Sequence, residues 1–330
     1  MSALKLSALT PGARVQHELL VLDRAEKRTN SGDPFVVLKL GNATGTIDTA
    51  PIWSDKLEWA AGADSGRIVQ AIGEVSLYAA KGQAKRQLAL TAPLRVLPHD
   101  GYRIEDFLPR IDVDPTRLWD FLDRTRAGLK SATLREVADL FFCDDDLRAR
   151  FERAPGSTQG HHAAIGGLLM HTSEVVRIAE QTARTMRKAN ADLVVIGAML
   201  HDVGKVESYE VGPSGFGYTP CGLLVGHVVL GALMLERRLA GLGRPVCSEA
   251  QLVELQHMIL SHHGKLEYGS PVQPMTPEAE IVHWADVASA KATDMFDALD
   301  DPELWSGSGE ISKRSWRLGR SVWKRPHDWE

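Results

Sequence analysis

The stretch Met199-Leu200-His201-Asp202-Val203-Gly204-Lys205 places an imidazole and a carboxylate side by side at the end of an apolar run. Residues 193–200 contain no polar side chain, which predicts a helix that is buried on every side. Burying a carboxylate without a partner costs several kcal/mol, so Asp202 needs one. A divalent first-row metal is the first candidate, since neutral imidazole and ionised carboxylate are both good ligands for it. A buried hydrogen bond between His201 and Asp202 is the alternative.

Four more predicted helices carry a histidine or an aspartate on an apolar face. His171, for example, follows Leu168 by three residues and precedes Val175 by four, so the three side chains share one helix face. One buried histidine is usually a core residue with a hydrogen-bond partner. Four helices that each direct such a side chain into their own apolar face are hard to explain by packing, and the pattern predicts metal binding. The residues on these helices are His171, His227, the pair His262 and His263, and Asp286.

Local signals mark the ends of two of these helices. Gly264 follows the histidine pair directly, which predicts a glycine at the helix C-cap. Thr276-Pro277-Glu278 predicts a helix start, because threonine caps, proline suits the first turn and an acidic residue suits the positive end of the helix.

The order of these residues resembles the HD-domain superfamily of metal-dependent phosphohydrolases, an all-helical fold whose dinuclear members use a series of H, HD, H, H and D. The resemblance covers roughly residues 160–300. Further strings are similar to the YhaM-type 3′-to-5′ exoribonucleases, which place an OB-fold domain in front of the HD domain. These strings are His161-His162-Ala163, Gly166-Gly167-Leu168-Leu169-Met170-His171-Thr172, Ser261-His262-His263-Gly264 and Gly269-Ser270-Pro271.

The resemblance implies a dinuclear metal site. Asp202 would bridge the two ions. The remaining ligands would be His171, His201 and Asp286 for one ion, and His227, His262 and, as an open alternative, His263 for the other.

Three residues near this series are candidates for contact with substrate. Lys205 would hold a phosphate oxygen and stabilise developing negative charge, and its alternative is a surface lysine at a helix end. His161 and His162 match the family string and would bind substrate, extend the metal shell or orient His171. Ser289 stands where the family usually has an acidic residue, which leaves a supporting carboxylate unaccounted for.

The donor set predicts the kind of ion. A site rich in imidazole favours manganese, iron, cobalt or zinc over magnesium, and the resemblance implies two ions, most often manganese. Two such ions about 4 Å apart would activate a hydroxide for in-line attack on phosphorus. We therefore expect hydrolysis of a phosphodiester or phosphomonoester, with Asp202 and Lys205 as catalytic residues.

The N-terminal region has the pattern of strands separated by turns. Apolar segments at 15–22, 34–40 and 43–53 precede a short helical stretch at 55–61, and segments at 67–78 and 87–96 follow, with turns at 30–33 and 80–83. Five short strands with a helix after the third predict an OB-fold barrel, the fold that the resemblance also implies.

OB-folds often bind single strands by stacking bases on aromatic side chains beside a basic groove. The alternative is that the aromatic residues belong to the barrel core and that the basic hairpin is a solvated turn. The candidates are Phe35, Trp53 and Tyr78 together with Lys81, Lys85 and Arg86.

The chain is therefore predicted to hold an all-β OB-fold domain at 1–97, a linker at 98–115, an all-α HD-domain helical bundle at 116–300 and a tail at 301–330. The proposed linker lacks clear periodicity. The tail interleaves basic residues with Trp316 and Trp323, which suits either contact with substrate or docking of the indoles on the HD domain.

Composition excludes several classes of protein. The net charge of −5 over 330 residues means that contact with nucleic acid requires local basic patches. The three cysteines are widely spaced and odd in number, which argues against a disulfide framework or a cysteine zinc site and fits a reducing cytoplasm. We find no apolar run long enough for a signal peptide or for a membrane span of roughly 18 residues, so we expect a cytoplasmic protein without a membrane partner.

Three classes of function remain. The first is a 3′-to-5′ exoribonuclease that acts on single-stranded RNA and releases 5′ monophosphates, with single-stranded DNA as a further candidate substrate. The second is an HD-domain phosphohydrolase of nucleotides or cyclic nucleotides, and the third is a non-catalytic nucleic-acid-binding protein. The complete ligand series counts against the third. The first two stay open, as does a homo-oligomer.

Overall fold

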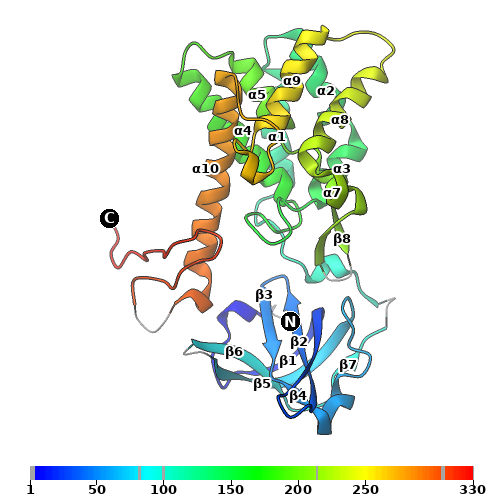
Figure 1. The fold of residues 1–330 in the computed structure, drawn as a ribbon, viewed down its shortest axis with the longest axis vertical. Helices are drawn as coiled ribbons and strands as arrows, with labels where there is room; N and C mark the ends of the chain where they lie inside the picture. Colours follow the sequence, from blue (N-terminus) through cyan, green and yellow to red (C-terminus); the bar gives the residue numbers. More distant parts are fainter. Residues whose placement is uncertain (1–3, 81–82, 99–100, 213–214, 306–308, 330) are drawn as a thin grey trace. The chain divides into compact units, whose positions relative to one another are not determined.

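The computed structural model describes residues 4–80, 83–98, 101–212, 215–305 and 309–329 (Figure 1). The chain divides into two compact units. One consists of Met1–Pro109, Val211–Gly217 and Asp301–Gly309, and the other of Arg110–Glu210, Tyr218–Asp300 and Glu310–Glu330.

The first unit is a β-barrel built on five longer strands. These are β1 (Arg14–Arg28), β2 (Pro34–Asn42), β3 (Gly45–Thr49), β5 (Ile68–Ala80) and β6 (Gln83–Leu90). Strand β1 pairs antiparallel with both β2 and β5, and β3 pairs parallel with β6, so the path β1-β2-β3-β6-β5 returns to β1. A 3-10 helix, η2 (Ser54–Ala60), lies between the third and fourth of these strands. This closed order is that of an OB-like barrel, as the sequence predicted.

The barrel forms because alternate side chains along each strand point inward. On β2, for example, Val36, Leu38 and Leu40 are buried in a core that also contains Leu19 and Leu88. Two predicted strands are interrupted. The stretch 43–53 divides into β3 and the two-residue β4 (Ile52–Trp53), and the stretch 87–96 divides into the end of β6 and β7 (Arg95–Val96). Lys81 and Gly82 of the predicted turn lie outside the described residues.

The aromatic and basic candidates of the barrel have different environments. Trp53 and Tyr78 are exposed, at 46% and 53%, so neither is a core residue. The rings of Phe35 and Trp53 pack against each other with centroids 5.0 Å apart. Arg86 donates through one guanidinium nitrogen to the carbonyl oxygens of Leu6, Ser7 and Leu9, so it fastens the 3-10 helix η1 (Leu6–Ala8) to the barrel.

The second unit is helical. Its helices are α1 (Pro115–Ala127), α2 (Ala132–Phe142), α3 (Asp145–Arg153), α4 (Gly167–Thr185), α5 (Ala191–Leu200), α6 (Lys205–Ser208), α7 (Pro220–Val225), α8 (His227–Ala240), α9 (Glu249–Ser261) and α10 (Pro277–Asp300). In the proposed linker the structure has the 3-10 helix η4 (Ile104–Phe107) before α1 begins.

The helix α5 is the centre of this unit. Asn190 caps it by accepting a hydrogen bond from the Leu193 backbone, and every residue from Leu193 to Leu200 is buried, as predicted. Helices α4, α5 and α10 pack against one another (Figure 1). The predicted start of α10 is also confirmed, because the Thr276 hydroxyl accepts from the Ala279 backbone.

Two features of this region differ from the sequence prediction. A two-stranded hairpin, β8 (Tyr209–Gly212) and β9 (Gly215–Tyr218), interrupts the helices, which the all-α prediction omitted. The predicted helix around His227 is also wrong at its start, because Gly226, at φ +81°, separates α7 from α8. Leu223, four residues before His227 and therefore on the same face of one continuous helix, lies on α7 instead and is 71% exposed.

No helix among the described residues is long and apolar enough to cross a membrane.

Candidate metal centre

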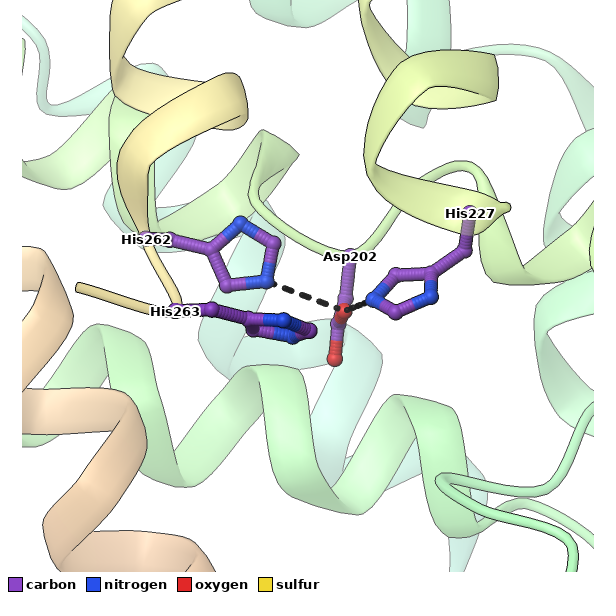
Figure 2. Close-up of side chains that lie close together, drawn as sticks. All are labelled: Asp202, His227, His262 and His263. Carbon is purple, nitrogen blue, oxygen red and sulfur yellow. Dashed lines mark ion pairs between the residues drawn. The ribbon is translucent and has the colours of Figure 1, made fainter. Parts of the chain in front are cut away.

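Asp202 lies at the centre of a buried group of histidines. The helix α5 ends at Leu200, and the turn that follows directs the Asp202 side chain, which is 1% exposed, into the helical unit. Its Oδ2 lies 3.3 Å from Nε2 of both His171 and His201. Its Oδ1 lies 3.3 Å from Nε2 of His227 and 3.6 Å from Nε2 of His262 (Figure 2). The two oxygens of one carboxylate thus face two different sets of histidines.

The first set contains His171, His201 and Asp286, whose ligand atoms lie within 4.8 Å of one another. His171 Nε2 lies 3.1 Å from Asp286 Oδ1 and 3.3 Å from His201 Nε2. These side chains come from α4, from the end of α5 and from α10, which are the three helices that pack together.

The second set contains Asp202, His227, His262 and His263, and its ligand atoms also lie within 4.8 Å of one another. Figure 2 shows the rings of His262 and His263, from the end of α9, on one side of Asp202 and the ring of His227, from the start of α8, on the other. The structure therefore brings all seven predicted ligands into two adjacent clusters with Asp202 between them.

Hydrogen bonds fix which ring nitrogen points into the clusters. The Nδ1 atoms of His201, His262 and His263 lie 2.8, 2.7 and 2.8 Å from the carbonyl oxygens of Ala198, Ile259 and Tyr268. A carbonyl only accepts, so each Nδ1 must carry the proton and donate it. In a neutral ring the inward-facing Nε2 then has a free lone pair, which is the form that binds a metal.

The residues present fit a metal ion. Asp202 Oδ1, His227 Nε2 and His262 Nε2 are all buried, and none has a hydrogen-bond partner of acceptable geometry. Buried polar atoms are rarely left in this state. With bonds of about 2.1 Å to one ion, adjacent ligand atoms lie roughly 3.0–3.4 Å apart, close to the separations found here.

The protonation states also suit a cation. Burial raises the pKa of the Asp202 carboxyl, but the charge of Lys205 and contacts with His201 hold it well below its usual value. Burial lowers the pKa of His201 and His227 despite the adjacent carboxylate, and lowers that of His263 to about 3. Burial opposes the charged form of His171 too, but hydrogen bonds to Asp202 and Asp286 raise its pKa to about 9. The carboxylates thus stay ionised and favour positive charge between them.

A hydrogen-bond chain that the sequence did not reveal orients His171. The Ser289 hydroxyl, on α10, donates to Glu174 Oε2 at 2.7 Å. Its oxygen lies 3.0 Å from His171 Nδ1 and therefore accepts the proton of that nitrogen. Glu174 thus supports His171 through Ser289, which leaves Nε2 of His171 facing Asp202 and Asp286.

Lys205 is a buried residue and not a surface lysine. Its ammonium group is 2.6 Å from Asp202 Oδ2 and donates to the Gly156 carbonyl oxygen at 2.7 Å. These contacts use two of the three N–H groups and leave one for a further acceptor beside the clusters.

His161 and His162 lie beside His171, with ring centroids 5.4 and 5.3 Å from its ring. Burial together with the nearby positive charges lowers the pKa of His161 to about 3. His162, at φ 54°, is 8% exposed, and its Nε2 lies 3.2 Å from Glu174 Oε2. His161 thus lies on the side of the first cluster, while His162 lies against the Glu174 chain.

Two glycines allow the clusters to close. A Cβ on Gly204 would overlap the His227 carbonyl oxygen, so only glycine lets the turn after Asp202 approach the start of α8. Gly264 has φ +76°, and a Cβ there would overlap the ring of His283. That ring donates through Nδ1 to the His262 carbonyl at 2.8 Å and thereby supports the end of α9. The sequence predicted Gly264 at the C-cap of this helix, but the C-cap residue is His262 and Gly264 lies two residues beyond it.

The hairpin places an aromatic pair at the second cluster. The ring of Tyr209 lies 6.4 Å from the His227 ring and 5.1 Å from that of Tyr218.

Sequence reasoning missed Tyr209, Glu174 and His283. Each of them contacts a residue on an element that is distant in the sequence. The only sequence signal for Glu174 was an acidic side chain within a predicted helix.

A helical unit with buried histidines and aspartates in two adjacent clusters is typical of a metal-dependent hydrolase of the HD class, and the HD-domain family model matches residues 168–291. An HD domain implies dependence on a divalent metal.

Relatives that match nearly the whole chain narrow the assignment. The 3′-5′ exoribonuclease YhaM of Bacillus subtilis is 31% identical over 318 residues, which is 95% of either chain. The YhaM exoribonucleases of Bacillus pumilus and Geobacillus sp. are both 30% identical over 314 residues, which is 95% of this chain and 95% and 92% of theirs. The chain therefore belongs to the YhaM family of 3′-5′ exoribonucleases.

Proposed function

We propose that this protein is an exoribonuclease that shortens single-stranded RNA from its 3′ end at the Asp202 centre. The activity is that of the relatives, whose names all describe 3′-5′ exoribonucleases. The observation that carries the assignment to this centre is the position of Asp202, whose two oxygens face separate groups of buried ligand atoms.

The centre holds two divalent ions in this proposal. His171, His201 and Asp286 would hold one, His227, His262 and His263 would hold the other, and Asp202, which lies between the two sets, would serve both. Five imidazoles and two carboxylates suit a first-row transition metal better than magnesium, and the family resemblance implies manganese among these metals. When bound, two such ions supply an activated water and stabilise the leaving oxygen.

The surrounding residues position the substrate. Lys205 uses its remaining N–H group to hold a non-bridging oxygen of the scissile phosphate, where negative charge develops. His161, which stays neutral, donates a hydrogen bond to the terminal nucleotide. His162 and Glu174 keep His171 in place beside Lys205.

The bond that breaks joins phosphorus to the 3′ oxygen of the penultimate nucleotide. Water adds to phosphorus, and its proton goes to the leaving 3′ oxygen. The products are a 5′ nucleoside monophosphate and an RNA that is one residue shorter and ends in a 3′ hydroxyl. Single-stranded DNA offers the same bond and differs at the sugar by lacking the 2′-hydroxyl, so a preference for RNA requires contact with that group.

The test uses single-stranded RNA labelled at its 5′ end, incubated with the protein and Mn²⁺. We expect a ladder that shortens from the 3′ end, release of 5′ monophosphates and slower degradation of RNA with a 3′ phosphate. Early internal cuts, or 3′ monophosphates as products, would contradict the proposal. A parallel reaction with DNA of the same sequence and one with a cyclic nucleotide define the substrate class.

A further inference from the structure

The C-terminal residues 309–329 form an ordered, folded-back segment. Isolated β-bridges join Ile311 to Trp323 and Ser315 to Arg320. The Ser312 N–H donates to the Val322 carbonyl oxygen at 2.8 Å, and the Ser315 N–H donates to the Arg320 carbonyl oxygen at 3.0 Å. The segment therefore presents its side chains on two defined faces.

The inner face fixes the segment to its own unit. Val322 is 2% exposed and Ser312 and Ser315 are 5% and 4% exposed. Arg317 binds α10 through Asp297, with Nη1 and Oδ2 3.0 Å apart. In Figure 1 the orange to red segment lies beside the end of α10. Arg317 thus anchors the segment on α10, while Val322 is buried in the fold-back.

The outer face carries the indoles. Trp316, Trp323 and Trp329 are 76%, 50% and 84% exposed. The ring of His327 lies between two of them, with centroids 6.1 Å from Trp323 and 5.5 Å from Trp329. Three exposed tryptophans within 14 residues are unfavourable in water unless a partner covers them, which is typical of a binding surface.

Charge indicates the kind of partner. Residues 310–330 contain six basic and three acidic side chains in a chain whose net charge is −5. Arg314, Arg320 and Arg325 are exposed on the same segment as the indoles. Indole faces stack on bases and guanidinium groups bind phosphates, so single-stranded RNA matches both features at once.

We infer that the outer face of residues 309–329 binds single-stranded RNA and holds the polymer while the catalytic centre removes nucleotides. Trp316, Trp323 and Trp329 stack on bases, and Arg314, Arg320 and Arg325 contact phosphates. The surface gives affinity without sequence preference, because every base has a face on which an indole can stack. The inference rests on the proposed function only for the identity of the polymer.

The test compares a long and a short substrate with the complete enzyme and Mn²⁺. The variant Trp316→Ala/Trp323→Ala/Trp329→Ala should raise KM for a 20-nucleotide RNA at least tenfold and leave kcat and the hydrolysis of a dinucleotide unchanged within twofold. The variant Arg314→Gln/Arg320→Gln/Arg325→Gln should reduce the slope of log affinity against log salt by about 2, as expected for three lost phosphate contacts on a single strand. Trp284→Ala is the matched control, because Trp284 is also an exposed indole, at 58%, and lies on α10 outside the C-terminal segment.

An unchanged KM for the long RNA in both variants would overturn the inference, as would an equal rise for both substrates. Binding of vesicles containing phosphatidylserine that depends on the indoles, with KM for RNA unchanged, would assign the face to a lipid surface instead. If the parent protein does not degrade RNA, the proposed function fails by itself. Fluorescence anisotropy with the labelled 20-nucleotide RNA then tests the face directly, and equal affinities of parent and tryptophan variant would refute it.

Discussion

At the scale of single residues, Asp202 shows how one side chain organises a buried polar site. A carboxylate that is 1% exposed is tolerated because Lys205 and four histidines surround both of its oxygens. Backbone carbonyl oxygens in turn orient His201 and His262 by accepting their Nδ1 protons, and the Ser289 hydroxyl orients His171 in the same way. The precision of the site thus comes from residues outside the ligand set.

The chain Glu174–Ser289–His171 gives the first prediction. Ser289→Ala removes the acceptor of the His171 Nδ1 proton, and Glu174→Gln removes the charge behind it. Loss of such a supporting partner typically lowers metal affinity about 10–100-fold. We expect a decrease of this size in Mn²⁺ affinity, measured by calorimetric titration.

Ser173→Ala is the control for this prediction. Its hydroxyl is equally buried but donates within its own helix to Leu169, so Mn²⁺ affinity should stay at the parent value. A change below twofold in both Ser289→Ala and Glu174→Gln would show that the chain does not hold His171 for the metal.

The contact between Gly204 and α8 gives the second prediction. In Gly204→Ala the new methyl group overlaps the His227 carbonyl oxygen, so the turn and α8 must move apart. Overpacking of this kind costs about 1–3 kcal/mol, and it should also displace His227. We expect a lower unfolding midpoint in urea together with loss of metal from the second cluster.

Gly241→Ala is the matched substitution, because the nearest atom to its Cβ would be 3.4 Å away and its φ of −64° suits alanine. It should keep the parent stability. Equal stabilities of the two variants would mean that the approach at Gly204 is not tight.

At the scale of elements, the periodicity of apolar residues predicted most of the helices and strands. It did not predict the contacts between elements that are distant in the sequence. The apolar run 193–200 and the His171 spacing gave α5 and the face of α4, since a helix imposes both locally. The break between α7 and α8 was missed because a single glycine, Gly226, ended an otherwise helical pattern. The link from Glu174 to Ser289 was missed because it joins residues 115 positions apart.

The barrel surface gives the third prediction. Across neighbouring strands, Lys27 lies opposite Phe35 and Phe35 lies opposite Trp53, so a base can stack on Trp53 beside a positive charge. Trp53→Ala should weaken binding of single-stranded RNA by about 1–3 kcal/mol, as measured by fluorescence anisotropy. Trp53→Phe retains an aromatic face and should recover most of the affinity, whereas identical affinities of parent and Trp53→Ala would exclude this surface.

At the scale of the whole molecule, the described structure combines an OB-like barrel with an HD domain, and the metal-binding clusters lie wholly in the helical unit. The clusters join α4, α8, α9 and α10 to the end of α5. An ion bound there therefore ties together elements that are separated by more than 100 residues in sequence.

This placement gives the fourth prediction. A ligand that binds only the folded chain stabilises it by mass action, by about 2.7 kcal/mol at a concentration 100 times its Kd. Removal of metal with a chelator should lower the Tm of the helical transition, and Mn²⁺ should restore it. A melting curve that is insensitive to chelator would argue against ions at the clusters.

We propose that two ions would bind in the helical unit, one beside each oxygen of Asp202. Anomalous diffraction at the manganese edge, from crystals of the protein grown with Mn²⁺, tests it most directly. We predict two anomalous peaks, one beside His171, His201 and Asp286 and one beside His227, His262 and His263, each next to a different oxygen of Asp202. A single peak, or peaks away from Asp202, would contradict the claim.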